Sequence, residues 1–417
     1  MKKVVSLALA AALAASCLAG CGGAKGGGEN TSAAPAQTEA AQTEAAQTAA
    51  QKEGAANGGE TAAAVAGAIK EGEFEDGDVG VVLVINTNLG DKSICDLSYA
   101  GLQQVCDKYG ARYKCIELGG DATKQLPTFT DLAEDPDWDI IVAGTYNLRE
   151  SLLEVAEEYP EQKFILYDAN VANEDEGIKA EDYPNVYSME HAQNEGSYVV
   201  GAAAAILTSS GAEKTNDDHV IGFVGGGQNT AIEDFLVGYI EGAKAVDPEI
   251  KVLISYIGDF KDTAKGKELA MAQIDQGADV VFAVAGGAGL GVLSGCAEKG
   301  VYAIGVDADQ YVTLLDTDPE TAKAICTSME KKCDMTVYNC TSKALEGTLP
   351  FGTYERLGLA DGVVGAADNE NFQSIFTADQ IKEILEVQDK VAKGEVSVPS
   401  AIGMGDADIQ AIKDSVQ

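Results

Sequence analysis

The stretch at residues 279–310 constrains the fold more than any other part of the chain. Residues 280–285 form a continuous apolar run, too short for a helix of its own and too apolar for a strand with one wet face. Such a run predicts a buried parallel strand. A glycine turn follows, residues 290–299 are typical of a short helix that a glycine ends, and residues 301–306 predict a second strand that stops at Asp307. The stretch therefore predicts a βαβ unit.

The two strand ends of this unit carry residues that suit a binding site. In open parallel sheets ligands bind beyond the carboxyl ends of the strands, and here those ends carry Gly286, Gly287 and Asp307. Glycine permits a close approach of the backbone, and a carboxylate accepts hydrogens from hydroxyl groups. The same residues also suit a tight turn and a cap on the next element, so both interpretations stay open at this point.

The alternation of strand and helix occurs in two runs, joined near residues 185–195. Strands are predicted at 80–85, 111–117, 139–143, 163–167, 219–224 and 252–257, and helices at 97–109, 123–135, 151–159, 197–207, 231–246 and 265–276. Two such runs predict an α/β protein with two doubly wound, Rossmann-like lobes and a central cleft. Tyr146 and Asp168 follow strands of the first run, which makes them candidates for the same cleft.

The lobes are not expected to be contiguous in sequence. The N-terminal lobe is predicted at 77–190 with a return at roughly 312–350. The C-terminal lobe is predicted at 191–311 with a return at roughly 351–417. The chain would then cross between the lobes more than once.

The N-terminus has the features of a secretory signal. Two lysines precede the apolar run 4–15, and Leu-Ala-Gly precedes Cys21, so residues 1–20 are predicted to be a signal peptide rather than a membrane span. This spacing resembles a bacterial lipobox, which implies cleavage before Cys21 and a lipid on its sulfur. The alternative is an ordinary signal peptide with an incidental cysteine. Residues 21–76, rich in Ala, Gly, Gln, Thr and Glu, are expected to be a low-complexity tether behind that cysteine.

Charge and composition exclude several classes of protein. The formal net charge of −38 argues against DNA, RNA or anionic lipid surfaces as partners. Nine cysteines without any Cys-x-x-Cys give no support for zinc or thioredoxin chemistry, and most are expected to be buried apolar residues. The only histidines, His191 and His219, leave few options for a metal cluster or a Ser-His-Asp arrangement. No metal or other cofactor is predicted.

Six short motifs together resemble a known family. They are Gly222-Phe-Val-Gly-Gly226, Phe235-x-x-Gly-Tyr-x-x-Gly-Ala243, Asp262-x-Ala-Lys-Gly-Lys267, Ala285-Gly-Gly-x-Gly289, Gly305-Val-Asp-x-Asp-Gln310 and Thr327-Ser-x-x-Lys331. In order and spacing the chain resembles the basic membrane protein family from about Gly80 to its C-terminus. These are substrate-binding lipoproteins of ABC importers, best known as purine nucleoside receptors. The resemblance implies the type I periplasmic-binding fold.

The resemblance also implies a binding mode. In that family a nucleoside lies between the lobes, with carboxylates on the ribose hydroxyls and aromatic rings on both sides of the base. Asp168, Asp307 and Lys331 match the positions that hold the sugar, and Phe260 matches the stacking residue of the C-terminal lobe. The two glycines after residue 285 would offer backbone groups. Read without the resemblance, Phe260 suits core packing and Lys331 suits a solvated helix.

The first loop departs from the family pattern. Where the family commonly has Asp-x-Ser-Phe-Asn, this chain has Asp91, Ser93, Ile94 and Cys95 at the matching positions. Ile94 cannot stack as a ring does, and Cys95 is a weaker hydrogen-bonding partner than asparagine. The sugar site is therefore expected to be kept and the base site to be changed. Tyr146 could supply the missing ring or only form part of the rim.

These features predict an extracytoplasmic lipoprotein, anchored to the cell membrane, that binds a nucleoside or related ribosyl metabolite and delivers it to the permease subunits of an ABC importer. One alternative is a sensing lipoprotein that signals to a membrane partner. Another is a nucleoside-processing hydrolase, which the sequence disfavours because its strand ends carry scattered aspartates without a dense acidic motif. The protein is predicted not to be an enzyme.

Overall fold

The structure, a computed structural model, describes residues 79–173 and 177–417. The predicted signal peptide, Cys21 and the predicted tether lie outside the described residues. Within the two described ranges, no helix has both the length and the hydropathy that crossing a membrane requires.

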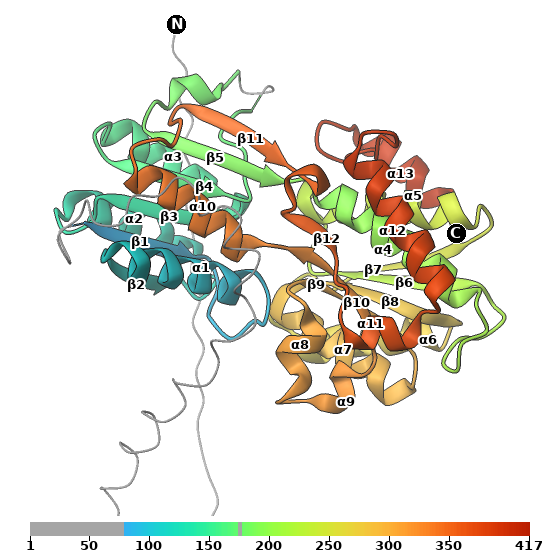
Figure 1. Ribbon diagram of the computed structural model, residues 1–417. Helices are drawn as coiled ribbons and strands as arrows, with labels where there is room; N and C mark the ends of the chain where they lie inside the picture. Colours follow the sequence, from blue (N-terminus) through green and yellow to red (C-terminus); the bar gives the residue numbers. More distant parts are fainter. Residues whose placement is uncertain (1–78, 174–176) are drawn as a thin grey trace, which may run out of the picture. The chain divides into compact units, whose positions relative to one another are not determined.

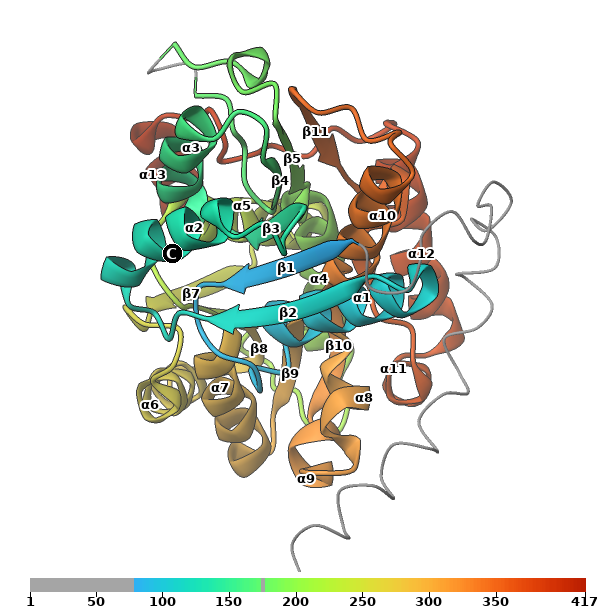
Figure 2. The same ribbon diagram turned by 90° about the vertical axis from the view of Figure 1, so that its left-hand side faces the viewer.

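The N-terminal lobe is built on a six-stranded sheet with the order β11-β5-β4-β3-β1-β2, in which every neighbouring pair is parallel. Its strands are β1 (Gly80–Ile85), β2 (Arg112–Glu117), β3 (Ile140–Gly144), β4 (Lys163–Tyr167), β5 (Val186–His191) and β11 (Thr353–Leu357), and its helices are α1 (Ile94–Tyr109), α2 (Gln125–Glu134), α3 (Arg149–Glu158) and α10 (Cys333–Leu345), with short 3₁₀ turns η3 (Ala122–Lys124), η4 (Tyr146–Leu148) and η5 (Ala180–Asp182). Alternate residues of β1 serve opposite faces: Val81 and Leu83 pack under α1 and α10, while Val82 and Val84 pack under α2 and α3. Figure 2 shows these two pairs of helices on opposite sides of the sheet. Helices therefore bury both faces of the sheet.

The C-terminal lobe repeats this architecture with the order β12-β10-β9-β8-β6-β7 (Figure 1). Its strands are β6 (Val220–Gly225), β7 (Lys251–Tyr256), β8 (Ala278–Val284), β9 (Tyr302–Asp307), β10 (Ile325–Lys331) and the antiparallel edge strand β12 (Val364–Ala366), and its helices are α4 (Gln193–Thr208), α5 (Thr230–Val246), α6 (Thr263–Ile274), α7 (Gly286–Lys299), α8 (Gln310–Leu315), α9 (Pro319–Ala322), α11 (Glu370–Ile375), α12 (Ala378–Ala392) and α13 (Asp406–Asp414), with the 3₁₀ turn η6 (Leu359–Asp361). Residues of α4, α5 and α12 share one core with β6 and β8, whereas α7 packs on the opposite face. The predicted alternation of strand and helix is confirmed in both lobes.

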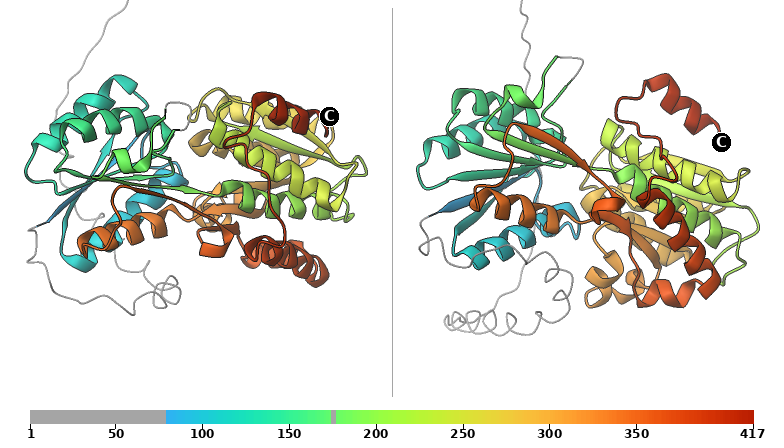
Figure 3. Two further views of the ribbon diagram at one scale, coloured as in Figure 1. Left: turned by 90° about the horizontal axis from the view of Figure 1, so that it is seen from above. Right: turned by 45° about the horizontal axis from the view of Figure 1, so that its top comes forward.

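Within the described residues, the chain crosses between the two sheets three times, after β5, after β10 and after β11 (Figure 3). The first crossing falls in the interval expected from the sequence. The second comes later than expected, because residues 312–331 lead into β10, which continues the C-terminal sheet beside β9. The return of the N-terminal lobe is therefore 333–357, comprising α10 and β11, instead of roughly 312–350.

The glycine turn predicted after β8 is instead the first turn of α7, which begins at Gly286. Further along the helix, Gly291 permits close packing against α6, because a Cβ there would lie 1.9 Å from the carbonyl oxygen of Thr263. Glycine is a poor helix former, so the many glycines at this position favoured the prediction of a turn over the start of a helix. Similarly, α1 begins at Ile94, three residues before the predicted start at Leu97.

Candidate ligand-binding site

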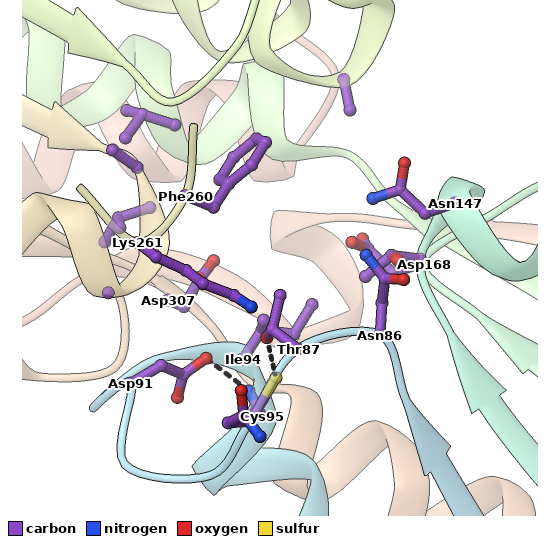
Figure 4. Close-up of a pocket in the computed structure, with 18 of the residues that line it drawn as sticks. Asn86, Thr87, Asp91, Ile94, Cys95, Asn147, Asp168, Phe260, Lys261 and Asp307 are labelled. Atoms are coloured by element: carbon purple, nitrogen blue, oxygen red, sulfur yellow. Dashed lines mark hydrogen bonds between the residues drawn. The ribbon is translucent and has the colours of Figure 1, made fainter. Parts of the chain in front are cut away.

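A cavity of about 360 Å³ lies between the lobes, at the carboxyl ends of strands from both sheets (Figure 4). This is the position that the topology of open parallel sheets favours for a ligand. All the predicted ligand residues except Ser93 line this cleft. Those lining it are Asp91, Ile94, Cys95, Tyr146, Asp168, Phe260, Gly286, Gly287, Asp307 and Lys331. Residues more than 200 positions apart in the sequence therefore meet at one place.

Two carboxylates stand at the strand ends that face each other across the cleft. Asp168 directly follows β4 and Asp307 ends β9, and both have left-handed backbones, with φ of 57° and 64°. Aspartate is among the few residue types other than glycine that adopt this conformation with some frequency. Their side chains are only 11% and 9% exposed. Two nearly buried carboxylates require a counter-charge.

Lys331, the last residue of β10, supplies that counter-charge. Its Nζ lies 2.9 Å from Asp168 Oδ2, 3.8 Å from Asp307 Oδ1 and 5.2 Å from the centre of the Phe235 ring. Burial by itself would lower the pKa of the Lys331 ammonium, but the two aspartates outweigh this effect and raise it. The interpretation of Lys331 as a solvated helix lysine is wrong, because the residue is a buried strand end that joins both carboxylates.

His191 lies behind Asp168 and fixes its orientation. Its Nδ1 is 3.0 Å from Asp168 Oδ1, and its Nε2 is 2.9 Å from the hydroxyl of Thr336. Complete burial lowers the pKa of His191 despite the nearby carboxylate, so the neutral ring donates from Nδ1 and accepts at Nε2. Burial would raise the pKa of Asp168, but Lys331 and His191 together lower it to about 2. Asp168 is therefore an anion at neutral pH.

Ser93 lies beneath the cleft surface and joins the lobes. Its hydroxyl donates to Asp307 Oδ2, and the side-chain amide of Gln310 donates to the carbonyl of Lys92 at 3.3 Å. Both bonds run from the loop before α1 to the C-terminal lobe. Ser93 thus orients Asp307 and leaves its other oxygen toward Lys331.

Asp91 holds the start of α1. Its two carboxylate oxygens accept hydrogen bonds from the backbone N–H groups of Ser93 at 3.0 Å, Cys95 at 3.0 Å and Asp96 at 3.2 Å. A carboxylate in this place satisfies the free N–H groups of a helix N-terminus and is favoured by the helix dipole. Burial raises the pKa of Asp91 in spite of these bonds. Asp91 therefore contributes to the site by fixing the shape of the loop before α1.

Other residues that line the cleft are less polar. Phe260 and Ile94 both line it, and Cys95, 6% exposed, has its sulfur 3.2 Å from the hydroxyl of Thr87. Burial raises the pKa of the Cys95 thiol, so it stays protonated. Tyr146 is 39% exposed and also lines the cleft.

Sequence reasoning missed several polar residues of this cleft: Asn86, Thr87, Thr145, Asn147 and Lys261. Thr145 is the most informative. It has a left-handed backbone with φ of 77°, and its hydroxyl is buried without a hydrogen-bond partner among the residues that the structure describes. In the sequence, only the position of Thr145 pointed to a role in the site, because this residue comes just after a predicted strand. Buried hydroxyls are normally satisfied, so this one is suited to a ligand.

Metal and thiol chemistry find no support in the described part of the chain. No group of three or more His, Cys, Asp or Glu side chains there is placed to hold a metal ion. Its seven cysteines are all unpaired, and all except Cys115 are buried. The prediction that most cysteines are small buried residues is confirmed.

Gly226 makes room for the Phe260 ring, and this gives a test of that ring. A Cβ at Gly226 would lie 2.4 Å from a ring carbon, so Gly226→Ala must displace Phe260. If the ring stacks on a ligand, we expect the dissociation constant to rise by up to about tenfold, the value of an aromatic contact. Gly289→Ala is the matched control, because its Cβ would meet nothing closer than 3.7 Å. Equal affinities of the two variants in calorimetry would show that Phe260 does not contact the ligand.

The chain resembles a known protein family and several individual proteins. Residues 79–401 match a family described as ABC transporter substrate-binding protein PnrA-like. The chain is 29% identical over 340 residues to the CD4+ T-cell-stimulating antigen of Listeria monocytogenes, covering 77% of this chain and 88% of that protein. It is 30% identical over 339 residues to the ABC transporter nucleoside-binding protein BmpA of Lactococcus lactis, covering 78% and 90%.

Solved structures agree on the fold. A solute-binding protein of an ABC transporter system from Aeropyrum pernix matches with a TM-score of 0.71 at 23% identity, covering 81% of this chain and 98% of its own. This likeness confirms the predicted type I periplasmic-binding fold.

Proposed function

The chain belongs to the PnrA-like family of ABC transporter substrate-binding proteins, and from this premise we propose that it is an extracytoplasmic receptor for a nucleoside or related ribosyl metabolite. The observation that carries the proposal is the cluster of Asp168, Asp307 and Lys331 at facing strand ends of one cleft. Neighbouring hydroxyls of a sugar donate to carboxylates, and such charge-assisted bonds are strong where water is excluded. The relative from Lactococcus lactis, by its name a nucleoside-binding protein, supports the same ligand class.

The remaining walls suit a base. In this proposal the sugar lies at the carboxylates and the base lies between Phe260 and Ile94. The backbone of Gly286 and Gly287, at the N-terminus of α7, borders the same space. The ligand would touch both lobes and be delivered from there to the permease subunits of an importer.

A hydrolase is a weaker candidate. General-base catalysis at neutral pH needs a group whose pKa lies near 7, whereas Lys331 and His191 overcome the effect of burial and lower the pKa of Asp168 to about 2. An ionised Asp168 can still accept hydrogen bonds from a bound ligand without taking part in a reaction. A sensing lipoprotein would use the same cleft, and its distinguishing partner would be a signalling protein in place of a permease.

The proposal is tested with purified protein and a panel of adenosine, guanosine, inosine, cytidine and uridine. Calorimetry should detect binding of at least one nucleoside, and chromatography should recover that nucleoside intact. Ribose-free bases are the control and should bind much more weakly, because the carboxylates would lack their hydroxyl donors. Release of free base would support the hydrolase, and binding of bases alone would refute the sugar site.

The base preference is expected to differ from that of a standard purine nucleoside receptor. Ile94 removes a stacking ring worth about 0.5–1.5 kcal/mol, and Cys95 cannot offer both the donor and the acceptor of an amide to a purine edge. We therefore expect binding that depends on the sugar, with a preference shifted toward a pyrimidine or another ribosyl compound. The double change Ile94→Phe with Cys95→Asn should increase purine affinity over the same panel. Tight purine-selective binding by the unmodified protein, unimproved by the double change, would contradict this.

We also propose that Cys21 is the lipidated N-terminus of the mature protein, supported by the Leu-Ala-Gly-Cys spacing. Several acyl chains together anchor a protein stably, so Cys21→Ser should move the protein from the membrane fraction to the soluble fraction. Ala24→Ser, three residues downstream, is the control and should stay with the membrane. Mass spectrometry that finds an unmodified N-terminus elsewhere would refute lipidation.

A further inference from the structure

A second cavity, of about 200 Å³, lies beside the main cleft and shares Tyr146, Asp168 and Ala231 with it. Its other walls include Glu190 in β5 and Gln193 at the start of α4, which flank the first crossing between the lobes. We call this cavity the side chamber. Since it borders Asp168, it adjoins the proposed sugar end of the ligand.

Both lobes contribute to the side chamber. Glu190 and Tyr146 belong to the N-terminal lobe, whereas Asn229 and Thr230 stand at the start of α5 in the C-terminal lobe. The side-chain oxygen of Asn229 caps α5 by accepting from the backbone N–H of Ile232 at 3.2 Å. A cavity walled by both lobes would be complete only when the lobes are together.

One buried hydrogen-bond acceptor among the residues of the side chamber is not in use. Gln193 is 4% exposed, and its Oε1 is buried without a partner in the described residues. Glu190, which is half-buried, also lines the side chamber, and its Oε2 accepts from the hydroxyl of Tyr354 at 2.6 Å. A buried acceptor left without a donor is unfavourable for the folded protein. The side chamber therefore suits a group that donates hydrogen bonds.

The charges of the side chamber agree with this. Glu190 and Asp168, both carboxylates, line the side chamber. Arg356 pairs with Glu190 in the β5–β11 register but is not among the lining residues, and its guanidinium donates to Asp234 at 3.1 Å and to the amide oxygen of Asn194 at 2.9 Å. Lys331 is similarly committed to Asp168. An anionic substituent would meet like charge here, whereas a neutral donor or a cation would be favoured.

We propose that the side chamber is a subsite for a hydroxyl or amino substituent on the sugar of the ligand, and that it discriminates against phosphorylated sugars. This inference rests on the proposed function, because it requires a sugar at Asp168. The ligand class it defines is a nucleoside or ribosyl compound without phosphate, carrying a donor group that reaches Glu190 and Gln193.

The test uses calorimetry on adenosine and uridine, their 2′-, 3′- and 5′-amino-deoxy analogues, and their 5′-monophosphates. One amino position should be preferred over the other two. Glu190→Gln should weaken that analogue about tenfold or more, the cost of a lost charge-assisted bond, and change the parent nucleoside much less. The monophosphates should bind most weakly.

Two further variants separate a specific loss from misfolding. Gln193→Met keeps the side-chain length and removes the amide, so it should also weaken the preferred analogue. Glu181→Gln, on the exposed turn η5, is the matched control and should change nothing. Melting temperatures of all variants identify those that fold. If Glu190→Gln does not fold, the affinities of Gln193→Met for the parent nucleoside and the preferred amino analogue alone test the subsite.

The outcomes distinguish the two proposals. If no nucleoside binds the unmodified protein, the proposed function fails and the subsite fails with it. If nucleosides bind, but Glu190→Gln and Gln193→Met affect parent and amino analogues equally, the subsite alone is overturned. Monophosphates that bind as tightly as the parent nucleosides would overturn it too, as would a crystal structure of the complex with only water in the side chamber.

Discussion

Lys331→Met is expected to destabilise the protein by about 3–5 kcal/mol at pH 7, the usual cost of removing one partner from a buried ion pair. Methionine keeps most of the side-chain volume and its packing over Phe235, but it leaves Asp168 and Asp307 buried without their shared cation. Ligand binding should fall as well, because two unpaired carboxylates repel each other and change position. Chemical denaturation with and without a nucleoside measures both effects.

The stability loss in Lys331→Met should depend on pH, and the pKa of Asp168 determines the direction of that dependence. In the folded protein Lys331 and His191 overcome burial and lower the pKa of Asp168 from 3.8 to about 2. The unfolded state therefore binds more protons between these values, and the carboxylate contributes about 2 kcal/mol that is present above pH 4 and lost as the pH falls toward 2. In Lys331→Met burial is no longer offset by the ammonium, so the pKa of Asp168 rises. The stability difference between variant and unmodified protein should then shrink on acidification.

Lys323→Met is the matched control for this experiment. Lys323 is in the same lobe, but it is 61% exposed and pairs with an exposed Glu320. Surface pairs of this kind contribute at most about 1 kcal/mol. A loss of similar size in both variants, or a pH-independent loss at Lys331, would show that the buried charge cluster is not what matters.

Asp307→Asn is expected to weaken nucleoside binding between about tenfold and a few hundredfold, the value of one charge-assisted hydrogen bond. Asparagine has the same shape and also tolerates the left-handed backbone at φ 64°, whereas alanine would add backbone strain to the measurement. The fold should survive, since an amide oxygen can still accept from Ser93. Calorimetry and thermal unfolding measure the two effects separately.

Asp316→Asn provides the comparison, because this exposed aspartate lies after α8, away from the cleft. It should leave both affinity and melting temperature unchanged. Normal affinity of Asp307→Asn, or loss of its fold at room temperature, would show that this carboxylate serves the structure instead of the ligand.

The fold was largely readable from the sequence because both sheets are buried on both faces. A parallel strand such as β8 then appears as an uninterrupted apolar run. Strand ends were equally readable, which is why Asp168 and Asp307 could be named as candidates. The crossings were harder: β10 and α10 follow one another directly, and nothing local in the sequence says that one belongs to each lobe.

The electrostatics of the site could not be read from the sequence. His191 stands 23 residues after Asp168, and Thr336 much later, so their hydrogen-bonded chain depends on the tertiary structure. Without the family resemblance, Lys331 suited a solvated helix lysine, because lysines are rarely buried unless they are paired. Ser93 was expected to touch the ligand, but its hydroxyl is used to orient Asp307.

The crossing after β10 has a consequence for how the chain can reach this structure. The N-terminal sheet is completed only when β11 pairs with β5, where Thr353 lies beside Tyr187. Most of the other lobe, from α4 to β10, lies between these two partners in the sequence. Pairings between such distant segments form slowly because the intervening loop must close first. Ribosomal synthesis therefore finishes most of the second lobe before the first can acquire its edge strand. A chain that stops before residue 353 would leave β5 as an open edge able to pair with a neighbouring molecule, so premature termination late in the gene should yield aggregation in place of a smaller binding domain.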